Sequence, residues 1–514
     1  MAKIATEGGG WRGAAERWLQ GLGYPAACIE TPMSGFVDEW WRYYRSEADF
    51  YVSELRDVNG TPHTVKVRSC TPARMVCEDM AGLIYNERAS VSVAEDGQAG
   101  QAAEWLAGWL ARTRFDDGAP QLVQRMCATG TGAWALHLRG VQVVGKSPGL
   151  GVSPQRYDAR HIAPLDWDGE ECTACAFVSQ VAVRGELLTQ VEVHRPNDRG
   201  DYEIMTRFFR DDGETVVPDG YSGGAISTRQ PRKTFELVTL ALDNPYWEGS
   251  PFGVALFDAA LGAIETTELA FDNIGNELVL GRKMVMIPEA MLRRDEATGR
   301  MMLPQEERLQ FYVALKDATV YADGRPMITE YNPSLRADED VRMLSTALQV
   351  LGKRCGFGTK YYALDESGGV ATAKQVASDN AEMMRTVHKH EQIVRPAIEG
   401  IVTAAASVFR SLGGLAIPDI EGAVNVVMGD SIIQDDDSLR ERDRADVAAA
   451  CWHRGATWCA GRATARTRHA RSAGSRTRPP RSPSRPKPWR SSPRTSERWP
   501  TRSCTARRSA WSPT

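Results

Sequence analysis

The chain has 514 residues, of which 42% are hydrophobic and 25% are charged. That length predicts two to four structural modules with a large buried core, and the composition is typical of a soluble globular protein. The net charge of −4 is unevenly distributed, because residues 451–514 hold sixteen basic residues and one acidic residue. Residues 1–450 therefore have 46 basic and 65 acidic residues, a net charge of −19. Such an acidic body argues against simple binding of DNA phosphates.

Membrane and redox signals are weak. No apolar stretch approaches the roughly 20 residues of a membrane span, and the N-terminus lacks the apolar region of a secretory signal. Of ten scattered cysteines, only Cys172 and Cys175 form a C-x-x-C pair, and the surrounding residues favour a buried strand over a metal or redox site. We therefore expect reduced thiols in a cytoplasm.

The first half of the chain predicts helices followed by strands. Residues 34–48 are typical of an aromatic-rich helix. A second helix is expected from Thr71-Pro72, where a threonine N-cap precedes a proline at the first helical position. Residues 170–245 are expected to be β-rich, because polar and apolar residues alternate around Glu192 and turn residues separate such runs.

The segment 250–412 contains the clearest helical periodicity. Apolar residues recur at three, four and seven after Pro251, which predicts a long helix, and a second set predicts another around 341–351. The first set is Phe257, Leu261, Ile264, Phe271, Ile274 and Leu278, and the second is Val341, Leu344, Leu348 and Leu351. Between these helices, the insert 281–335 has strand-like ends at 284–287 and 327–331.

A glycine-bearing loop and a third long helix follow. The capping box Thr372-Ala373-Lys374-Gln375 predicts where this helix opens, and Pro396 predicts a kink within it. The order is therefore helix, small β insert, helix, loop and long kinked helix. Two interpretations of the first helix pair stay open: packing against neighbouring subunits in a ring, or an antiparallel pair inside one globular core.

Several short segments match one protein family in this same order. They are WWRYY at 40–44, MVCEDMAGLIYNE at 75–87, GTGA at 130–133, SPFG at 250–253, AFDNIGNE at 270–277, GRK at 281–283, CGFGT at 355–359, TAKQV at 372–376, KHE at 389–391 and DSIIQD at 430–435. Together they resemble the portal proteins of tailed bacteriophages with long non-contractile tails. The matches are diffuse, cover roughly residues 34–450 and include no catalytic signature.

The resemblance implies an α+β fold of portal type, with a division into named regions. These are a wing at 1–250 with part of 373–430, stem helices at 252–280 and 336–355, a clip at 281–335, a tunnel loop at 356–371, the long kinked helix at 372–412 and the start of a crown at 431–450. It further implies a dodecameric ring at one capsid vertex of a virion, assembled in the cytoplasm of a bacterial host. Such a ring is a structural channel for double-stranded DNA and is not an enzyme.

The resemblance also implies partners and candidate sites. The partners are other copies of the chain, DNA in the channel, the terminase large subunit, a head-completion adaptor, and the major capsid and scaffolding proteins, with no membrane and no cofactor. The candidates for the DNA channel are Lys360, Tyr361, Tyr362, Asp258, Glu265 and Asp272, and those for partner binding by the clip are Arg293, Arg294 and Arg300. The three acids repeat every seven residues, so they form either a phosphate-repelling channel wall or a solvated helix face.

Enzymatic alternatives find little support in the residues. Gly352-Lys353 lacks a Walker A pattern, since Ala347 stands at the glycine position and Arg354 where serine or threonine is needed. His388 and His390 sit on nearly opposite helix faces, so one metal ion cannot take both. The acids at 430 and 435–437 could hold a cation, but such a run more often caps a helix. The rival functions are a terminase-like motor or metal nuclease, and another head-assembly connector.

The segment 451–514 has an anomalous composition. It contains no Ile, Leu, Val, Met, Phe, Tyr, Asn, Gln or Asp, so it cannot build an aliphatic core. Two interpretations are open: a disordered basic arm that touches packaged DNA, or a reading-frame shift after about position 450. Either one departs from the helical crown that the family resemblance implies.

Overall fold

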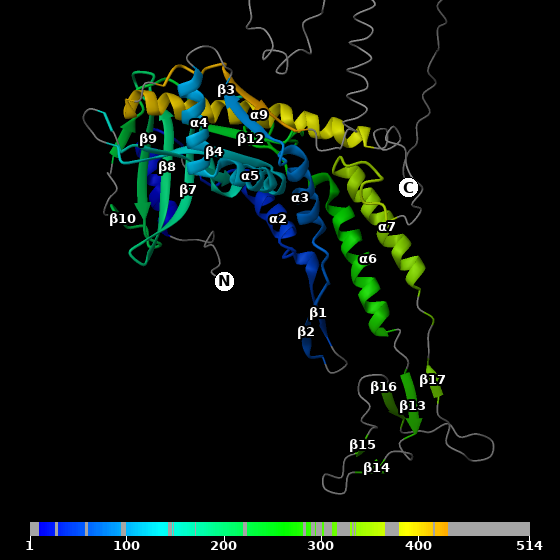
Figure 1. Ribbon diagram of the computed structural model, residues 1–514. Coiled ribbons are helices and arrows are strands. Elements are labelled where there is room, and N and C mark those ends of the chain that lie inside the picture. The colour runs from blue at the N-terminus through cyan, green and yellow to red at the C-terminus, as the bar shows by residue number, and fades with distance from the viewer. Residues whose placement is uncertain are drawn as a thin grey trace, which may run out of the picture. The chain divides into compact units, whose positions relative to one another are not determined.

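The structure is a computed structural model. It describes residues 10–25, 29–56, 60–93, 99–141, 146–147, 149–169, 171–218, 224–280, 284–288, 293–294, 301–302, 311–315, 329–331, 334, 336–364, 380–414 and 417–429. The chain divides into two compact units, Met1–Arg440 and Glu441–Thr514. All described residues belong to the first unit, in which helices and mainly antiparallel sheets combine in an α+β arrangement (Figure 1).

A six-stranded sheet forms one layer of this unit. Its strands are β6 (Ile162–Asp168), β7 (Glu171–Val183), β8 (Glu186–Pro196), β9 (Tyr202–Phe209), β10 (Thr215–Val216) and β11 (Gly224–Ser227). Alternation along the strands separates two faces. Ala176 and Val191 pack against Trp18 of helix α1 (Gly10–Gly21), whereas Cys175 and Phe177 face a second sheet.

The second sheet has the order β12-β4-β5, from β4 (Thr131–Arg139), β5 (Gly151–Asp158) and β12 (Phe235–Thr239). Ala133 and Ala135 face the six-stranded sheet, whereas Trp134 and Leu136 enter the main core. The expected β-rich segment 170–245 is confirmed, and so is the placement of the C-x-x-C pair in a buried strand, since both thiols lie in β7. All six cysteines within the described residues are free thiols.

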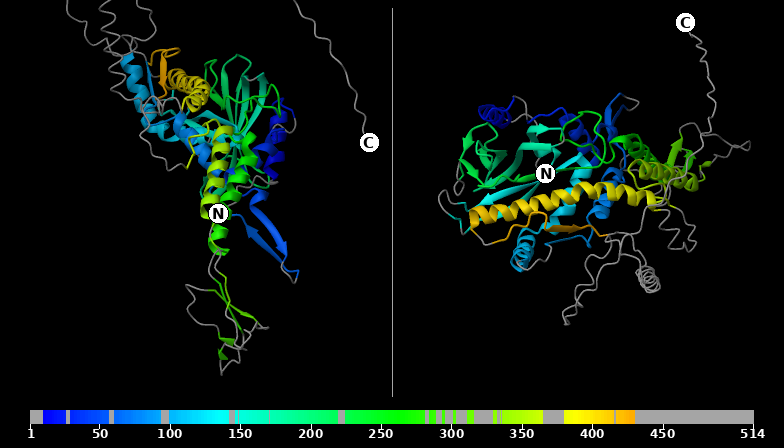
Figure 2. Two further views of the ribbon diagram at one scale, coloured as in Figure 1. Left: turned by 90° about the vertical axis from the view of Figure 1, so that its right-hand side faces the viewer. Right: turned by 90° about the horizontal axis from the view of Figure 1, so that it is seen from above.

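Helices cover the Trp134 face of this second sheet. They are α2 (Ser34–Tyr44), α3 (Pro72–Ile84), α4 (Ala99–Thr113), α5 (Phe115–Thr129) and α9 (Ala381–Val408). Figure 2 shows α9 running across these layers when the molecule is seen from above. Alongside α9, strand β3 (Ser90–Val93) pairs with β18 (Val424–Val427), which joins distant parts of the chain. A separate hairpin pairs β1 (Val52–Arg56) with β2 (Pro62–Lys66), and both strands are exposed along their whole length.

Two further helices, α6 (Leu261–Leu280) and α7 (Ala337–Arg354), lie side by side and run in opposite directions (Figures 1 and 2). The segment between them contains a three-stranded sheet of β13 (Met284–Pro288), β16 (Phe311–Leu315) and β17 (Thr329–Tyr331), and a short pair, β14 (Arg293–Arg294) with β15 (Met301–Met302). The predicted order of helix, small β insert and helix is therefore confirmed. The division into portal regions stays a prediction.

Several expected boundaries are wrong. The helix expected at 34–48 ends at Tyr44, and the one expected after Pro251 begins at Leu261, preceded by a 3-10 turn at Asp258–Ala260. Helix α3 begins where predicted, but Thr71 does not cap it, because its φ of 53° is left-handed and its side chain makes no cap hydrogen bond. Helix α9 is continuous through Pro396, and the kink expected there stays a prediction. The capping box at 372–375, the crown and the tail lie outside the described residues.

Two of the family-like motifs meet in a close backbone contact. Gly130 ends α5 with a φ of 83°, as a tight turn requires, and lies against Gly253. A β-carbon on Gly253 would stand 2.5 Å from the carbonyl oxygen of Gly130. The Gly253 amide donates a hydrogen bond to Thr131 Oγ1 at 2.9 Å. This contact fixes the segment that leads into α6 against the end of α5.

Candidate functional site

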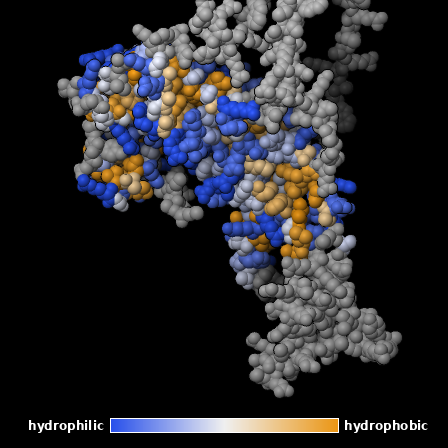
Figure 3. All heavy atoms as spheres, viewed as in Figure 1, coloured by the Kyte–Doolittle hydropathy of each residue, from blue (hydrophilic) through white to orange (hydrophobic). Residues whose placement is uncertain are grey.

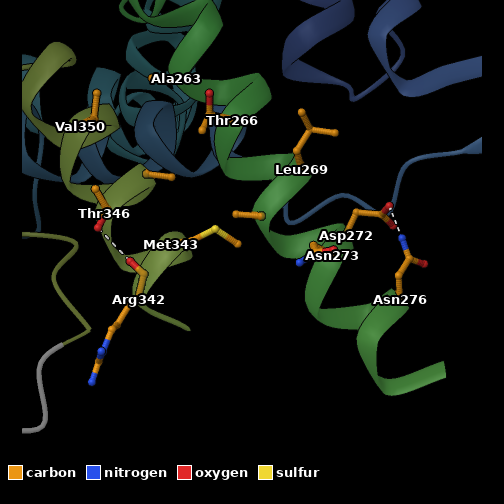
Figure 4. Close-up of a pocket in the computed structure, with 12 residues that line it drawn as sticks. Ala263, Thr266, Leu269, Asp272, Asn273, Asn276, Arg342, Met343, Thr346 and Val350 are labelled. Carbon is orange, nitrogen blue, oxygen red and sulfur yellow. Dashed lines mark hydrogen bonds between the residues drawn. The ribbon is translucent and has the colours of Figure 1, made fainter. Parts of the chain in front are cut away.

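A groove of about 830 Å³ lies between α6 and α7 (Figure 4). Leu269 of α6 is 53% exposed, and Met343 and Val350 of α7 are 50% and 48% exposed. Figure 4 shows Met343 reaching from α7 toward α6. The full lining is Ala263, Thr266, Leu269, Ala270, Asp272, Asn273, Asn276, Arg342, Met343, Thr346, Ala347 and Val350. Figure 3 shows apolar residues gathered over these two helices.

Polar contacts hold the two helices in register at one end of the groove. Arg336, just before α7, forms an ion pair of 3.2 Å with Glu277 of α6. Asn273 Nδ2 donates to Asp340 Oδ1 at 2.9 Å, and Asp340 lies in the first turn of α7, where a carboxylate is favoured by the helix dipole. The helix pair is therefore a defined unit with an open apolar side.

The acids at seven-residue spacing turn toward their own chain. Asp258 Oδ1 accepts a hydrogen bond from Trp40 Nε1 at 2.9 Å, and Glu265 Oε1 accepts one from Tyr43 OH at 2.6 Å. Asp272 Oδ1 accepts one from the Arg68 amide at 3.1 Å, and Asp272 Oδ2 accepts one from Asn276 Nδ2 at 2.8 Å. All three are half-buried. Their spacing is explained by contacts within the subunit, and a role in a channel stays a prediction.

The acid that the sequence reasoning missed lies on the same helix. Glu268 is fully buried and accepts hydrogen bonds from Tyr51 OH at 2.9 Å, from Ser69 Oγ at 2.5 Å and from the Cys70 amide at 2.8 Å. Burial and the Glu268 charge raise the pKa of the Cys70 thiol to about 12. The available signal was its position one turn after Glu265 on the same helical face as Ile264 and Phe271, where a carboxylate needs partners. Glu268 anchors α6 to the segment that follows the β1–β2 hairpin.

The loop expected at 356–371 is described up to residue 364. Lys360 and Tyr361 are exposed, and the ring of Tyr361 packs 4.9 Å from that of Phe357. Tyr362 instead donates a hydrogen bond of 2.5 Å from its hydroxyl to Asp79 of α3. Burial, with Asp79 as acceptor, raises the pKa of the Tyr362 hydroxyl well above its usual range. Of the three channel candidates in this loop, Lys360 and Tyr361 are therefore exposed, whereas Tyr362 ties the loop to α3.

The remaining candidates are only partly described. Arg293 and Arg294 form β14, whose register pairs them with Met302 and Met301 of β15. Arg300 and the acids at 430 and 435–437 lie outside the described residues.

The two histidines of α9 serve separate contacts. His388 Nδ1 is 2.9 Å from Glu391, whereas His390 Nδ1 accepts a hydrogen bond from the Ala241 amide at 3.0 Å.

Within the described ranges, no group of three or more His, Cys, Asp or Glu is arranged to hold a metal ion. Across those same ranges, no helix has both the length and the apolar character needed to cross a membrane.

Comparison with known proteins finds structural likenesses that are weak. No protein-family model and no curated sequence matches the chain. A chain from the neck of a native gene transfer agent (GTA) particle, computed with C12 symmetry, is similar with a TM-score of 0.35 at 10% identity, over 75% of this chain and 87% of that one. A chain from the virion of a native GTA particle has a TM-score of 0.34 at 12% identity, over 74% and 86%. TM-scores this low do not establish a shared fold.

Proposed function

We propose that the chain is a portal-type subunit, one of about a dozen copies that close into a ring around a channel for double-stranded DNA. The observation that carries this proposal is the open apolar groove between α6 and α7. The proposed occupant of the groove is a neighbouring copy of the same chain. The order of helix, small sheet and helix and the distributed motifs that resemble portal proteins support the same function.

The energetics of the groove favour self-assembly. Leu269, Met343 and Val350 are each about half exposed in the single chain, so covering them contributes roughly 1 kcal/mol per side chain. A closed ring repeats this gain at every interface, because each copy uses the same two surfaces. At one end of the groove, Asn273 is paired with Asp340 Oδ1, whereas Asp340 Oδ2 is buried without a hydrogen-bond partner among the described residues.

The proposal assigns roles to the other regions. The segment 281–335, with Arg293, Arg294 and Arg300, is the proposed docking site for the packaging motor and later for a head-completion adaptor. Lys360 and Tyr361 are the proposed channel contacts with DNA. Capsid and scaffolding proteins are the proposed partners around the ring, and the proposed location is the capsid vertex of a virion. In this role the protein conducts DNA and catalyses no reaction.

Native mass spectrometry of the purified full-length protein tests the proposal. We expect a closed species of about a dozen subunits, and a particle image with a central channel. A stable monomer at micromolar concentration over a range of salt concentrations would overturn it.

A further inference from the structure

A second cavity, of about 300 Å³, lies at the edge of the two packed sheets, around strand β5. Three arginines line it: Arg125 from α5, Arg139 at the end of β4 and Arg156 from β5. The other lining residues are His137, Gln155, Tyr157, His161, Val178, Ser179, Gln180, Val181 and Gln190. The volume is at the lower end of the range for small-ligand sites. Such a concentration of positive charge is notable in a body with a net charge of −19.

The carboxylates close to this cavity are already engaged elsewhere. Glu192 is buried and lies 3.2 Å from His137 Nδ1. Asp158 is buried as well, and it pairs with Arg160 at 2.8 Å and with His161 Nδ1 at 3.0 Å. Although burial acts in the opposite direction, these two partners hold the pKa of Asp158 below its usual range. Both carboxylates are therefore paired with residues other than the three arginines.

Arg125, Arg139 and Arg156 themselves form no ion pair with any carboxylate among the described residues. Asp117 acts on Arg156 from a distance, but its own ion pair is with Arg114 at 2.8 Å. The lining therefore presents guanidinium groups that no acid of the described chain neutralises.

The fold makes room for one of these guanidinium groups. Gly118 lies two helical turns before Arg125 on α5, and a β-carbon there would overlap the guanidinium of Arg156. Burial, followed by the nearby charge of Arg125, lowers the pKa of Arg156. Both side chains are exposed to solvent, and two neighbouring like charges repel each other unless an anion joins them. A side chain at position 118 would have to displace the flexible end of Arg156, so the glycine leaves space for this guanidinium group.

We propose that this cavity binds a phosphate group, held by Arg125, Arg139 and Arg156. Guanidinium groups match phosphate oxygens through paired N–H donors, and several of them converge where phosphate is recognised. Gln155, Ser179 and Gln190 supply neutral polar groups on the walls. The phosphate is either a free ion or small phosphorylated molecule, or a phosphodiester of nucleic acid. This site is separate from the α6–α7 groove and does not depend on assembly through it.

Calorimetric titration of the full-length protein in chloride buffer tests the proposal, with inorganic phosphate, with pyrophosphate and with a short DNA duplex. We expect Arg125→Gln combined with Arg156→Gln to weaken phosphate or pyrophosphate binding by about tenfold or more. Arg139→Gln should weaken binding in the same direction. Because Arg139 is exposed at a strand end, this variant keeps the test valid if the double variant fails to fold. The matched control is Arg112→Gln, an exposed arginine on α4 outside the lining.

The DNA titration distinguishes the two sources of phosphate. If the same variants weaken DNA binding and DNA competes with pyrophosphate, the ligand is a phosphodiester; if only the small anions respond, it is a small phosphate compound. The arginine-rich segment 451–514 could itself bind DNA, but it is identical in all variants. The affinities of the variants are therefore compared with one another and with the wild-type protein. Failure of the wild-type protein to bind any of the three probes would overturn the proposal, as would equal binding by the pocket variants and Arg112→Gln.

Discussion

His194 lies fully buried between the two sheets. Its Nδ1 is 2.7 Å from Thr234 Oγ1, whereas its Nε2 has no hydrogen-bond partner among the described residues. Burial lowers the pKa of His194 from 6.5 to about 4. The folded protein therefore holds this ring neutral at a pH where the unfolded chain protonates it.

Stability should fall as the pH is lowered from about 6.5 toward 4, because the unfolded state then binds a proton that the native state excludes. His194 should lower the free energy of unfolding by on the order of 2 kcal/mol between pH 7 and pH 5. Urea unfolding at several pH values and fixed protein concentration measures it. His194→Asn should flatten the slope, whereas His63→Gln, at an exposed hairpin position, should not. Equal slopes in both variants would contradict the assignment.

The contact of Gly130 with Gly253 gives a steric prediction. Gly253→Ala should destabilise the protein by about 1–3 kcal/mol, since the added methyl group meets the Gly130 carbonyl oxygen at 2.5 Å. Gly262→Ala is the matched control, because a β-carbon there meets nothing within 4 Å and the residue lies inside α6. That control should stabilise by up to about 1 kcal/mol. Thermal unfolding of both variants decides, and similar midpoints would refute the steric explanation.

Residue roles were only partly predictable from the sequence. The seven-residue spacing singled out Asp258, Glu265 and Asp272. It could not show that Trp40 donates a hydrogen bond to Asp258 and Tyr43 one to Glu265, each from more than 200 residues away. Helical spacing describes which side chains share a face and carries no information on what covers that face. The partners depend on tertiary packing, so the acids were predicted to face solvent or a channel.

At the scale of elements, local patterns predicted the type of element better than its ends. The apolar repeat placed α7 well, and the strand-like segments expected at 284–287 and 327–331 overlap β13 and β17. The start of α6 was predicted too early because Phe257 fits the repeat, although it lies in the core just before a 3-10 turn. The left-handed φ of Thr71 likewise follows from the chain path into α3 and not from the threonine itself.

The helix pair gives a prediction about assembly. Leu269→Asp and Met343→Asp should each dissociate the proposed ring, because a buried, unpaired carboxylate at every interface costs several kcal/mol. The thermal midpoint of the single chain should change little, since both side chains are half exposed. Native mass spectrometry and thermal unfolding measure the two effects. Leu187→Asp, at an exposed apolar residue of β8 outside the groove, is the control; an intact ring in both groove variants would refute the groove as interface.

At the scale of the whole molecule, the first unit stacks α1, a six-stranded sheet, a three-stranded sheet and a layer containing α5 and α9. The β-rich composition of 170–245 predicted strands there. It did not predict two sheets, because β4 and β5 come before that segment and pair with β12 from its end. Long-range pairing of this kind leaves no local signature in the chain.

Removal of 451–514 should leave the first unit folded. That unit ends at Arg440, and the removed segment has no Ile, Leu, Val, Met, Phe or Tyr with which to join its core. We expect a thermal midpoint within a few degrees of the full-length value. A large fall would mean that the segment docks on the body. Sequencing the surrounding gene tests the frame-shift interpretation, which requires a helical continuation in a neighbouring frame.

The pairing of β3 with β18 has a consequence for biosynthesis. Val93 lies opposite Val424, so β3 is synthesised early in translation but can pair with β18 only after more than 300 further residues have been made. Helix α9, which covers the second sheet, also emerges late. A ribosome-bound nascent chain therefore exposes the apolar surface of α3 and of the second sheet for most of its synthesis, and such intermediates are prone to aggregate. We expect the growing polypeptide to need a chaperone until position 427 has left the ribosome.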